Sequence, residues 1–586
     1  MESSNKHGLL FFIKMIAKSN PIYMIHKSLF TILDALNPSI NIILIQVIMN
    51  ILGQNMPILH IIRILVMFLL YYIIQIIYTT WYQNAFLPKS ITNIKSNINK
   101  LIFKKIKYLD MKCYDDPKFY DLYTMASAES DTRVIEVIDT IYDLIKNIIG
   151  ISALSAIIIY IDFGIMIFSL VNLLISVIIG NLINKYQYKY ENKRIPFYRR
   201  MSYVKRIFSL KEYSKEIKIF SISNILLNLY NNQKENIINT YKESSKRLCL
   251  MLSVIGIFSI FTEYSIIFYL VYNVINNKIL IGDFIAMVSA SQQFRNMLGG
   301  IFGFFPKLQN HSLYIDRIKR FLDYKSLIEK QDGMQLKEEM CKIKMENISF
   351  AYNDLISLNH INLSISKGEK IAIVGSNGAG KSTLIRLLLR MYEPIDGHIY
   401  YNDYKYEECN VYSLRKKISV VFQDFQVYAL SIAENILMKP IENKMEENKI
   451  WEILDICDLK EKVENLKNGI FTLMTKEFNE DGEVFSKGEI QKLAIARALA
   501  MNSEILIMDE SSSNIDSIAE NKIFEKIFSL YNDKTIIFIS HRLHITKNAD
   551  RIYYMENGEI LEQGNFDQLM KKEGKYYNMY IQQYLN

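Results

Sequence analysis

The sequence has few cysteines, and none of them forms a C-x-x-C pair. No group with metal-ligand spacing is visible among its eight histidines either. Four of the cysteines fall in segments that the charge pattern assigns to the cytoplasm, and Cys249 lies at the inner end of an apolar run. We therefore expect free thiols rather than a disulfide framework.

Charge is missing from two long apolar runs in the first half of the chain. Ile64–Leu87 and Phe163–Asn184 contain no Asp, Glu, Lys or Arg. Each is long enough to cross a hydrocarbon core of about 30 Å as a helix, which takes roughly 20 residues. A buried bundle of soluble helices is the alternative, but unbroken uncharged runs of this length argue against it. With four less pure runs, the predicted spans are 29–52, 58–87, 137–161, 163–184, 248–275 and 284–305.

Lysine and arginine are distributed unevenly between the connections. The two long connections, 88–136 and 185–247, are rich in both, whereas the three short ones carry almost no positive charge. The positive-inside rule then places both termini and both long connections in the cytoplasm. This asymmetry explains the formal net charge of +8, so a nucleic-acid partner is not required. No cleavable signal peptide is apparent.

The long cytoplasmic connections show helical spacing rather than disorder. Apolar residues recur at helical intervals in 184–206 and 224–246, which predicts that the fourth and fifth spans continue below the membrane. Leu210–Ser221 forms an amphipathic turn at one far tip, and Asp115–Tyr120 has the pattern of a capped helix start at the other. These tips are suited to receive movement from a partner domain, or they are ordinary loop helices.

The pattern changes after a charged stretch, 323–342, which we interpret as a linker. From 343 to 586, short apolar strands alternate with helices, and this predicts a mostly parallel sheet covered on both faces. The fold class expected is therefore multidomain: an all-α six-helix transmembrane domain (1–322) followed by an α/β P-loop NTPase domain. The predicted strands are 343–352, 361–365, 371–374, 505–508 and 535–539.

Residues Gly375–Thr383 read G-S-N-G-A-G-K-S-T and directly follow the apolar strand Ile371–Val374. This is the phosphate-binding loop G-x-x-x-x-G-K-[ST] in its strand-to-helix setting. Its backbone N–H groups turn toward an anion, Lys381 supplies a cation for the β- and γ-phosphates, and Ser382 can coordinate Mg²⁺. The motif predicts that the chain binds a nucleoside triphosphate.

Further polar residues follow other apolar strands. Ile505–Met508 ends in Asp509 and Glu510, which are placed to hold Mg²⁺ and to polarise the attacking water, respectively. His541 follows the strand 535–539, and Gln423 lies in V-F-Q-D-F.

At this point the chain resembles the ATP-binding cassette (ABC) transporter family, in particular exporters whose six-span half is fused to one nucleotide-binding domain. The resemblance implies ATP and Mg²⁺ as cofactors and a second half-transporter as partner. It further implies that Tyr352 stacks on adenine, that Gln423 senses Mg²⁺ and the γ-phosphate, and that His541 contacts the γ-phosphate. Ser513–Asp516 resembles the D-loop, and the two tips resemble coupling helices. The implied metal ligands are Ser382, Gln423 and Asp509, the catalytic residues Glu510, His541, Lys381 and Gln423, and the phosphate-loop contacts Gly375, Ser376, Asn377, Gly378, Ala379, Gly380, Lys381, Ser382 and Thr383.

One motif departs from the family pattern. The family signature L-S-G-G-Q is F-S-K-G-E here, at Phe485–Glu489. Ser486 and Gly488 are kept and are implied to contact a nucleotide across a dimer interface. Lys487 lacks the backbone freedom of glycine, and the carboxylate of Glu489 would oppose phosphate, so we expect a weakened contact. This suggests a heterodimer with one weak ATP site; a homodimer that tolerates a divergent signature is the alternative.

The function that the sequence predicts is ATP-driven export by alternating access in a bacterial plasma membrane, with the cassette in the cytoplasm. The substrate is a peptide, a lipid or an amphipathic small molecule. Asp34, Glu263 and Arg295 lie within predicted spans and are candidate pathway groups, or structural polar contacts inside the bundle. A membrane assembly with a regulatory rather than pumping cassette is a further alternative.

Overall fold

The computed structural model describes residues 12–53, 57–330, 332–353, 355–509, 517–531, 533–540 and 543–585. The chain forms two compact units. Residues 1–106 and 121–324 make up the first, and residues 107–120 and 325–586 the second. The short segment Lys107–Tyr120, which the predicted boundaries counted with the transmembrane domain, thus belongs to the compact unit that contains the cassette.

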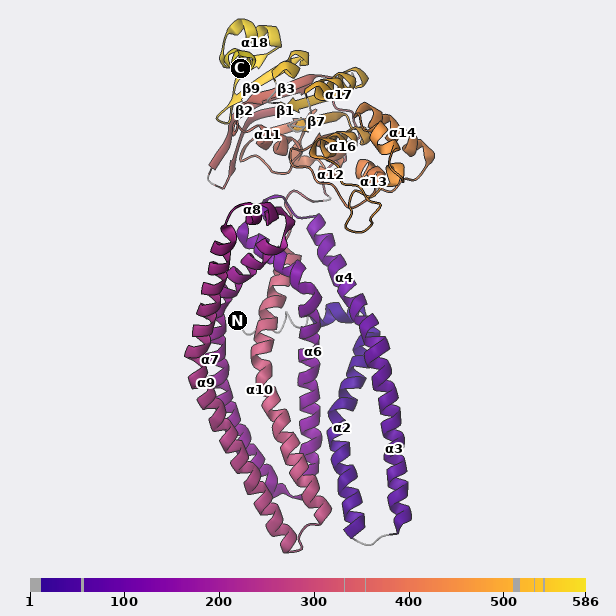
Figure 1. Cartoon of the computed structure of the whole chain (residues 1–586), viewed down its shortest axis with the longest axis vertical. Coiled ribbons are helices and arrows are strands. Elements are labelled where there is room, and N and C mark those ends of the chain that lie inside the picture. Colours follow the sequence, from indigo (N-terminus) through magenta and orange to yellow (C-terminus); the bar gives the residue numbers. More distant parts are fainter. Residues whose placement is uncertain are drawn as a thin grey trace. The chain divides into compact units, whose positions relative to one another are not determined.

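The first unit consists of long helices (Figure 1). Each predicted span lies within this set, and the span 58–87 runs through a π-helical turn into the next helix. Within the described residues, four helical stretches are long and apolar enough to cross a membrane: Pro21–Gly53, Ile58–Lys107, Thr132–Ile161 and Ile222–Ile275. The elements are α2 (Pro21–Gly53), α3 (Ile58–Trp81), η1 (Tyr82–Phe86), α4 (Leu87–Lys107), α6 (Pro117–Ile161), α7 (Phe163–Ser209), η2 (Lys211–Tyr213), α8 (Ser214–Ile219), α9 (Ile222–Ile275) and α10 (Ile281–Asp323).

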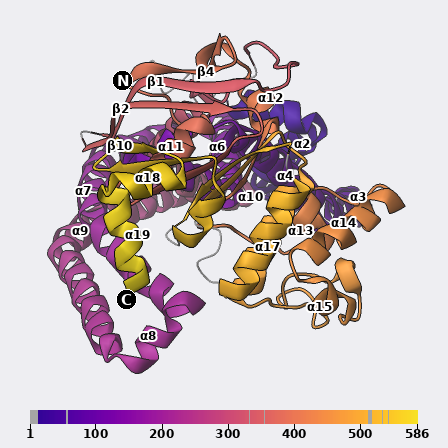
Figure 2. The ribbon, with the colours of Figure 1, turned by 90° about the horizontal axis from the view of Figure 1, so that it is seen from above.

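Helices α7 and α9 confirm the predicted extensions of the fourth and fifth spans. They run side by side over much of their length, and η2 and α8 join them at one end (Figures 1 and 2). At the other end, Asp162 caps α7 by accepting a hydrogen bond from the N–H of Gly164 at 2.7 Å. The same carboxylate accepts from Tyr269 and Asn273 of α9, so it fixes both helices where the chain turns.

The three candidate pathway residues, Asp34, Glu263 and Arg295, have partners within the helical unit. Asp34 pairs with Lys146 at 2.5 Å, and Glu263 of α9 pairs with Arg295 of α10 at 2.6 Å. Arg295 also donates to the carbonyl oxygen of Ser259. These pairs give all three residues a structural role as contacts between helices; a role in a substrate pathway stays a prediction.

The second unit is built on two sheets. A six-stranded sheet has the order β10-β9-β3-β8-β7-β6, and a four-stranded antiparallel sheet has the order β2-β1-β4-β5. In the larger sheet β9, β3, β8, β7 and β6 are parallel, as predicted, and β10 is an antiparallel edge. The strands are β1 (Lys342–Tyr352), β2 (Leu355–Ser366), β3 (Lys370–Gly375), β4 (Asp396–Tyr401), β5 (Tyr404–Lys405), β6 (Ile418–Val421), β7 (Ile505–Asp509), β8 (Thr535–Ile539), β9 (Arg551–Glu556) and β10 (Glu559–Gly564).

Helices surround these sheets, and both faces of the larger one are buried. Alternate residues of β3 enter two different core clusters: Ala372 and Val374 pack on one face, Ile371 and Ile373 on the other. Strands packed on both faces read as continuous apolar runs, which is why their sequence signal was clear. The helical elements are α5 (Lys112–Asp115), α11 (Lys381–Leu388), η3 (Tyr406–Glu408), α12 (Val411–Lys416), α13 (Ile432–Leu437), α14 (Lys444–Ile456), α15 (Lys460–Glu464), η4 (Gly469–Phe471), α16 (Lys487–Ala500), α17 (Ser517–Leu530), η5 (Leu543–Asn548), α18 (Phe566–Lys572) and α19 (Lys575–Leu585).

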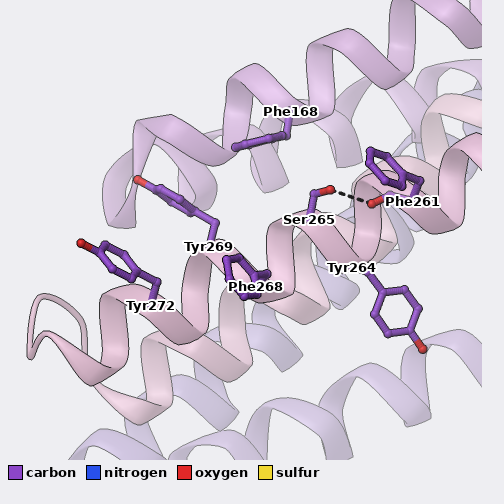
Figure 3. A pocket seen from close by; sticks show the side chains of 7 residues that line it. All are labelled: Phe168, Phe261, Tyr264, Ser265, Phe268, Tyr269 and Tyr272. Carbon is purple, nitrogen blue, oxygen red and sulfur yellow. Dashed lines mark hydrogen bonds between the residues drawn. The ribbon is translucent and has the colours of Figure 1, made fainter.

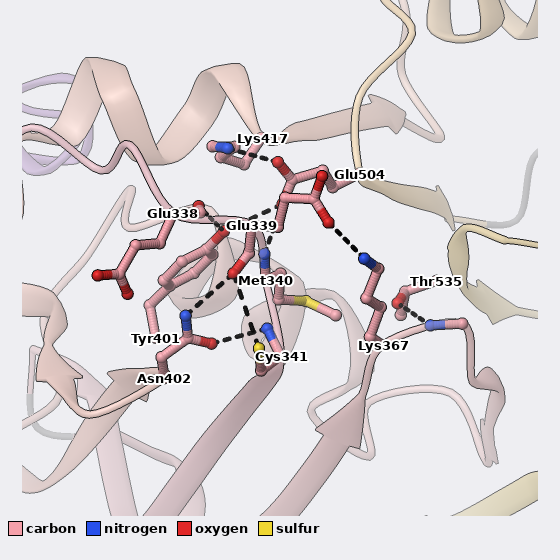
Figure 4. A network of polar contacts seen from close by, with 11 residues as sticks. Glu338, Glu339, Met340, Cys341, Lys367, Tyr401, Asn402, Lys417, Glu504 and Thr535 are labelled. Atoms are coloured by element: carbon pink, nitrogen blue, oxygen red, sulfur yellow. Dashed lines mark hydrogen bonds and ion pairs between the residues drawn. The ribbon is translucent and has the colours of Figure 1, made fainter.

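A polar network joins the end of the predicted linker to the core of the cassette (Figure 4). The carboxylate of Glu504, just before β7, accepts hydrogen bonds from the N–H of Met340 at 2.8 Å and from the hydroxyl of Tyr401 at 3.1 Å. It also pairs with Lys417. Burial, and then the charge of Glu504, raise the pKa of Tyr401, so its hydroxyl stays a donor. The start of β1 is thereby tied to the larger sheet.

Candidate nucleotide-binding site

The predicted phosphate loop connects the buried strand β3 to α11. Gly375 has a φ of +155°, and a β carbon there would lie 2.0 Å from the carbonyl oxygen of Met555. Gly380 has a φ of +97°, and its β carbon would meet Leu358 at 2.6 Å. Both positions therefore require glycine, because any side chain would push the loop away from the neighbouring strands.

Lys381 is the first residue of α11 and only 5% exposed. Its ammonium group donates to the carbonyl oxygens of Gly375 and Ser376, both at 2.9 Å. The cation is thus held within the curve of the loop, beside the backbone groups that the motif predicts will surround a phosphate. Ser382 is half-buried one residue later, and the Thr383 hydroxyl lies 3.0 Å from that of Ser357.

The strand order places two more of the predicted residues, Asp509 and Gln423, at the same edge of the sheet as the phosphate loop. Strands β3, β8, β7 and β6 are parallel neighbours, so their carboxyl ends lie together, where open α/β sheets bind ligands. Asp509 ends β7 and is 5% exposed, and the exposed Gln423 follows β6 by two residues. Glu510 and His541 lie outside the described residues, as does the predicted D-loop Ser513–Asp516.

Tyr352, the predicted adenine contact, ends β1 and is held on two sides. Its hydroxyl accepts a hydrogen bond from Arg386 of α11 at 2.8 Å. Its ring centroid lies 5.4 Å from that of Tyr392, with the rings at 83°. Sequence patterns did not single out Arg386 or Tyr392, since both lie on or just after α11 with no motif around them.

The altered signature forms the start of α16. Ser486 is the N-cap of this helix, and its hydroxyl accepts from the N–H of Glu489 while the Glu489 carboxylate accepts from the N–H of Ser486. Lys487 is the first helical residue and is not among the residues with positive φ. The backbone part of the argument for a weakened contact is therefore wrong, because a helical conformation suits lysine without strain; the weakened contact itself stays a prediction.

The segment Lys107–Tyr120 contacts the cassette within the second unit. The predicted start at Pro117 is confirmed as the beginning of α6, but the short helix of this tip is α5, which ends at Asp115. Asp110 is 3% exposed, and its carboxylate accepts from the N–H groups of three linker residues at 2.7, 3.0 and 3.0 Å. The three donors are Leu327, Ile328 and Glu329.

The linker in turn is bound to the end of the phosphate-loop helix. Glu329 pairs with Arg415 at 2.7 Å, and Arg415 donates to the carbonyl oxygens of Leu389 and Arg390 just after α11. Asp115 of α5 accepts a hydrogen bond from Tyr392. Two chains of contacts therefore run from the tip segment to residues 389–392, which directly follow the helix that begins with Lys381.

An aromatic pocket of about 530 Å³ lies between α7 and α9 (Figure 3). The rings of Phe168 and Tyr269 are 6.0 Å apart across the two helices, and Ser265 donates its hydroxyl back to the carbonyl of Phe261. The lining combines apolar ring surface with tyrosine hydroxyls: Phe168, Phe261, Tyr264, Ser265, Phe268, Tyr269 and Tyr272.

Comparison with known proteins supports the same interpretation of the fold and the loop. Residues 358–513 match the family model described as ABC transporter. The subtilin transport ATP-binding protein SpaT of Bacillus subtilis is 30% identical over 483 residues, which are 82% of this chain and 78% of SpaT. The chain belongs to the ABC transporter family. The nisin transport ATP-binding protein NisT of Lactococcus lactis is 26% identical over 582 residues, covering 97% of this chain and 95% of NisT.

Two further matches concern the fold and the possible range of cargo. The ATP-bound structure of a bacterial Atm1-family ABC exporter aligns with a TM-score of 0.75 at 18% identity, covering 99% of this chain and 98% of that one. The ATP-dependent lipid A-core flippase of Syntrophus aciditrophicus is 32% identical over 321 residues, 55% of this chain and 52% of the flippase. The chain is thus an ABC half-transporter, an integral multi-pass membrane protein that binds ATP and couples its hydrolysis to export as part of a dimer.

Proposed function

We propose that this ABC half-transporter exports an amphipathic peptide across a bacterial plasma membrane, driven by ATP bound at the loop Gly375–Thr383. The observation that carries the ATP site is the buried ammonium of Lys381, held by two loop carbonyls inside a turn that only glycine allows at its ends. A triphosphate that enters the loop competes with the two carbonyl oxygens for this cation. Its phosphate oxygens also accept hydrogen bonds from the backbone N–H groups of the loop.

The residues around the loop suit Mg²⁺ as the second cofactor. Ser382, Asp509 and Gln423 offer a hydroxyl, a carboxylate and an amide oxygen, which are the hard donors that Mg²⁺ prefers. When bound, the ion neutralises charge on the β- and γ-phosphates. Asp509 ends a strand that is buried on both faces, and Gln423 is exposed on the segment that follows β6.

The chemical step that we propose is hydrolysis of ATP: the oxygen of water bonds to the γ-phosphorus, the bond from that phosphorus to the β–γ bridging oxygen breaks, and ADP leaves with that bond's electron pair. Glu510 polarises the water as a general base, because it follows the strand end next to Asp509. His541, which follows β8, contacts the γ-phosphate, and Lys381 stabilises the charge that develops on it. Tyr352 stacks on adenine, and its hydrogen bond from Arg386 fixes the ring at the end of β1.

ATP closes two cassettes, and this closure moves the spans. Each ATP must bind the closed state more tightly than the open one, since only such a difference shifts the equilibrium. Ser486 and Gly488 contact the nucleotide of the second half-transporter. A heterodimer with one weak site remains the proposal that Lys487 motivates, but the unstrained helix start of the signature also suits a homodimer.

The cargo class is supported by two matches that span most of this chain. SpaT and NisT are named for the transport of subtilin and nisin, and both alignments run through the helical unit as well as the cassette. The lipid flippase match covers only about half of either chain. The aromatic pocket between α7 and α9 offers ring surface and hydroxyl groups, which suit an amphipathic peptide with aromatic or aliphatic side chains.

The test uses the transporter purified in lipid nanodiscs. Wild type should hydrolyse ATP only with Mg²⁺, and Lys381→Ala should lower the rate by at least about a hundredfold, because a charge-bearing contact to the transferring phosphate is lost. Glu510→Gln should keep ATP binding and lose hydrolysis. Subtilin or nisin should raise the ATPase rate of wild type, and lipid A should not; the reverse would favour a lipid flippase. Unchanged hydrolysis in Lys381→Ala would refute the ATP site.

A further inference from the structure

Lys462 contacts both ends of the altered signature. It lies on the short helix α15, 23 positions before Phe485 in the numbering of the sequence. Its ammonium group donates to Oε1 of Glu489 at 2.8 Å and lies 4.7 Å from the centroid of the Phe485 ring. These are the first and last residues of F-S-K-G-E, and both differ from the family pattern. One lysine therefore interacts with both of the altered end positions.

Each oxygen of the Glu489 carboxylate accepts one of these hydrogen bonds. Oε2 accepts the N–H of Ser486 at 2.8 Å, and Oε1 accepts from Lys462. Burial by itself would raise the pKa of Glu489, but the hydrogen bonds from Lys462 and Ser486 lower it. The group is ionised at neutral pH, and Lys462 is the counter-charge that balances it.

The remaining charge of the signature is positive. Lys487 is exposed and has no ion pair or hydrogen bond among the residues that the structure describes. With Glu489 balanced by Lys462, the charge of Lys487 is left to act on whatever faces the start of α16. Without Lys462, the carboxylate of Glu489 would offset Lys487, and the segment would carry no net charge.

We propose that Lys462 is a positioning residue of the nucleotide site: by binding Glu489 and covering Phe485, it makes F-S-K-G-E a competent signature for the triphosphate held by the second half-transporter. This inference rests on the proposed function, in which Ser486 and Gly488 contact that nucleotide. It predicts that the residues that differ from the family pattern work together, with Lys462 balancing the charge of Glu489, and that the motif still functions.

A double-mutant cycle in ATP hydrolysis tests the inference on the transporter isolated from its own host membrane through a tag on this chain. Lys462→Met keeps an apolar stem over Phe485 but removes the charge, so KM for ATP should rise about tenfold, the loss typical of one charge-assisted hydrogen bond. Glu489→Gln is the second single variant of the cycle: glutamine also completes a capping box, so the helix start is kept while the negative charge is removed. In the double variant, KM should return to within about twofold of wild type, because no uncompensated carboxylate remains.

Two further measurements separate positioning from a purely structural role. The defect of Lys462→Met should shrink as salt is raised from about 10 mM to about 300 mM, because the unbalanced carboxylate acts through screened charge. Lys460→Met is the matched control: it lies on the same helix and pairs at 4.0 Å with Glu464, away from the signature, so its kinetics should match wild type.

Each result has a defined meaning. Equal losses in Lys462→Met with and without Glu489→Gln, or a loss that salt does not change, would overturn the inference and leave Lys462 as a packing residue. Wild-type kinetics in Lys462→Met would overturn it as well. Either outcome, with hydrolysis abolished by Lys381→Ala, leaves the proposed function intact. Hydrolysis that survives Lys381→Ala would refute the proposed function itself.

Discussion

Replacing Asp110 by alanine should release the linker from the cytoplasmic tip segment. In the folded protein the buried carboxylate of Asp110 accepts the backbone N–H groups of Leu327, Ile328 and Glu329. Alanine removes all three hydrogen bonds without adding volume. Asparagine is the milder change, because its one remaining oxygen can still accept from two of the three donors while its amide group faces the third.

The expected cost follows from the type of bond and from its exposure. A hydrogen bond to a charged group contributes about 1.5 to 3 kcal/mol, and bonds to one carboxylate are not additive. The side chain of Leu327 is 69% exposed, so water can reach part of the released backbone. We therefore expect a local loss of about 2 to 4 kcal/mol for alanine and about 1 to 2 kcal/mol for asparagine.

Hydrogen exchange measured by mass spectrometry reads this loss directly. Amides of the linker peptide that contains these three donors should exchange about 30- to 700-fold faster in Asp110→Ala than in wild type, since each 1.4 kcal/mol is a factor of ten. Asp116→Ala is the control, because it removes an exposed carboxylate from the same segment. Unchanged exchange of the linker in Asp110→Ala would refute the claim that this carboxylate holds it.

Three more outcomes follow from other parts of the structure. Gly375→Ala should abolish ATP binding in a fluorescent-nucleotide titration, because its β carbon would clash at 2.0 Å with a carbonyl oxygen of β9; binding at wild-type affinity would contradict this. Glu504→Ala should lower the thermal midpoint of the cassette by a few degrees, since about 1 to 2 kcal/mol of charge-assisted bonding from a half-buried carboxylate is lost; an unchanged midpoint would show that water replaces it. Maleimide should label the exposed Cys341 of the cassette at pH 7.5 in the native protein and leave Cys457, where burial raises the pKa to about 12, unmodified until the chain is denatured.

The parts of the fold that sequence predicted well are those with a strong local signal. The strand 535–539 was predicted with the bounds of β8, because a strand buried on both faces is a continuous apolar run between polar residues. The phosphate loop was located by spacing alone, and the backbone at Gly375 and Gly380 shows why that spacing is needed. Helix ends could not be predicted as well: the strand-to-helix setting of the phosphate loop predicts a helix after it, but not that α11 begins at Lys381 and ends at Leu388.

The contacts that sequence could not predict join distant parts of the chain. Asp110 and Leu327 are 217 positions apart, and Asp115 and Tyr392 are 277 apart. Asp110 stands in no pattern that distinguishes it from a solvated residue of a charged loop, and the helix-start pattern at Asp115–Tyr120 does not predict a partner so far along the chain. Their partners follow from how the tip segment packs against the cassette, so the assignment of Lys107–Tyr120 to the second compact unit needed the structure.

The signature F-S-K-G-E contains a local sequence signal, a capping box, that a residue-by-residue comparison with L-S-G-G-Q does not reveal. Measured against L-S-G-G-Q, Glu489 counts as a loss, and this led to the expectation of a weakened contact. The spacing of Ser486 and Glu489 is also that of a capping box, S-x-x-E, which predicts that the carboxylate turns back onto its own helix start. The structure confirms this pattern, and Lys462 balances the charge that is left.

The case for a weak ATP site therefore depends on Lys487 alone. Its backbone is helical and unstrained, so the remaining objection is the bulk of its side chain where a nucleotide approaches. A flexible lysine stem can move aside while its ammonium group stays near phosphate, whereas a rigid side chain could not. If the signature is compensated, Lys487→Gly should lower ATP affinity, because it removes a cation near the phosphate. If the signature is weakened, the same change should raise ATP affinity, because it removes the bulk of the side chain. The sign of that change, read from KM at low salt, distinguishes a compensated signature from a weakened one.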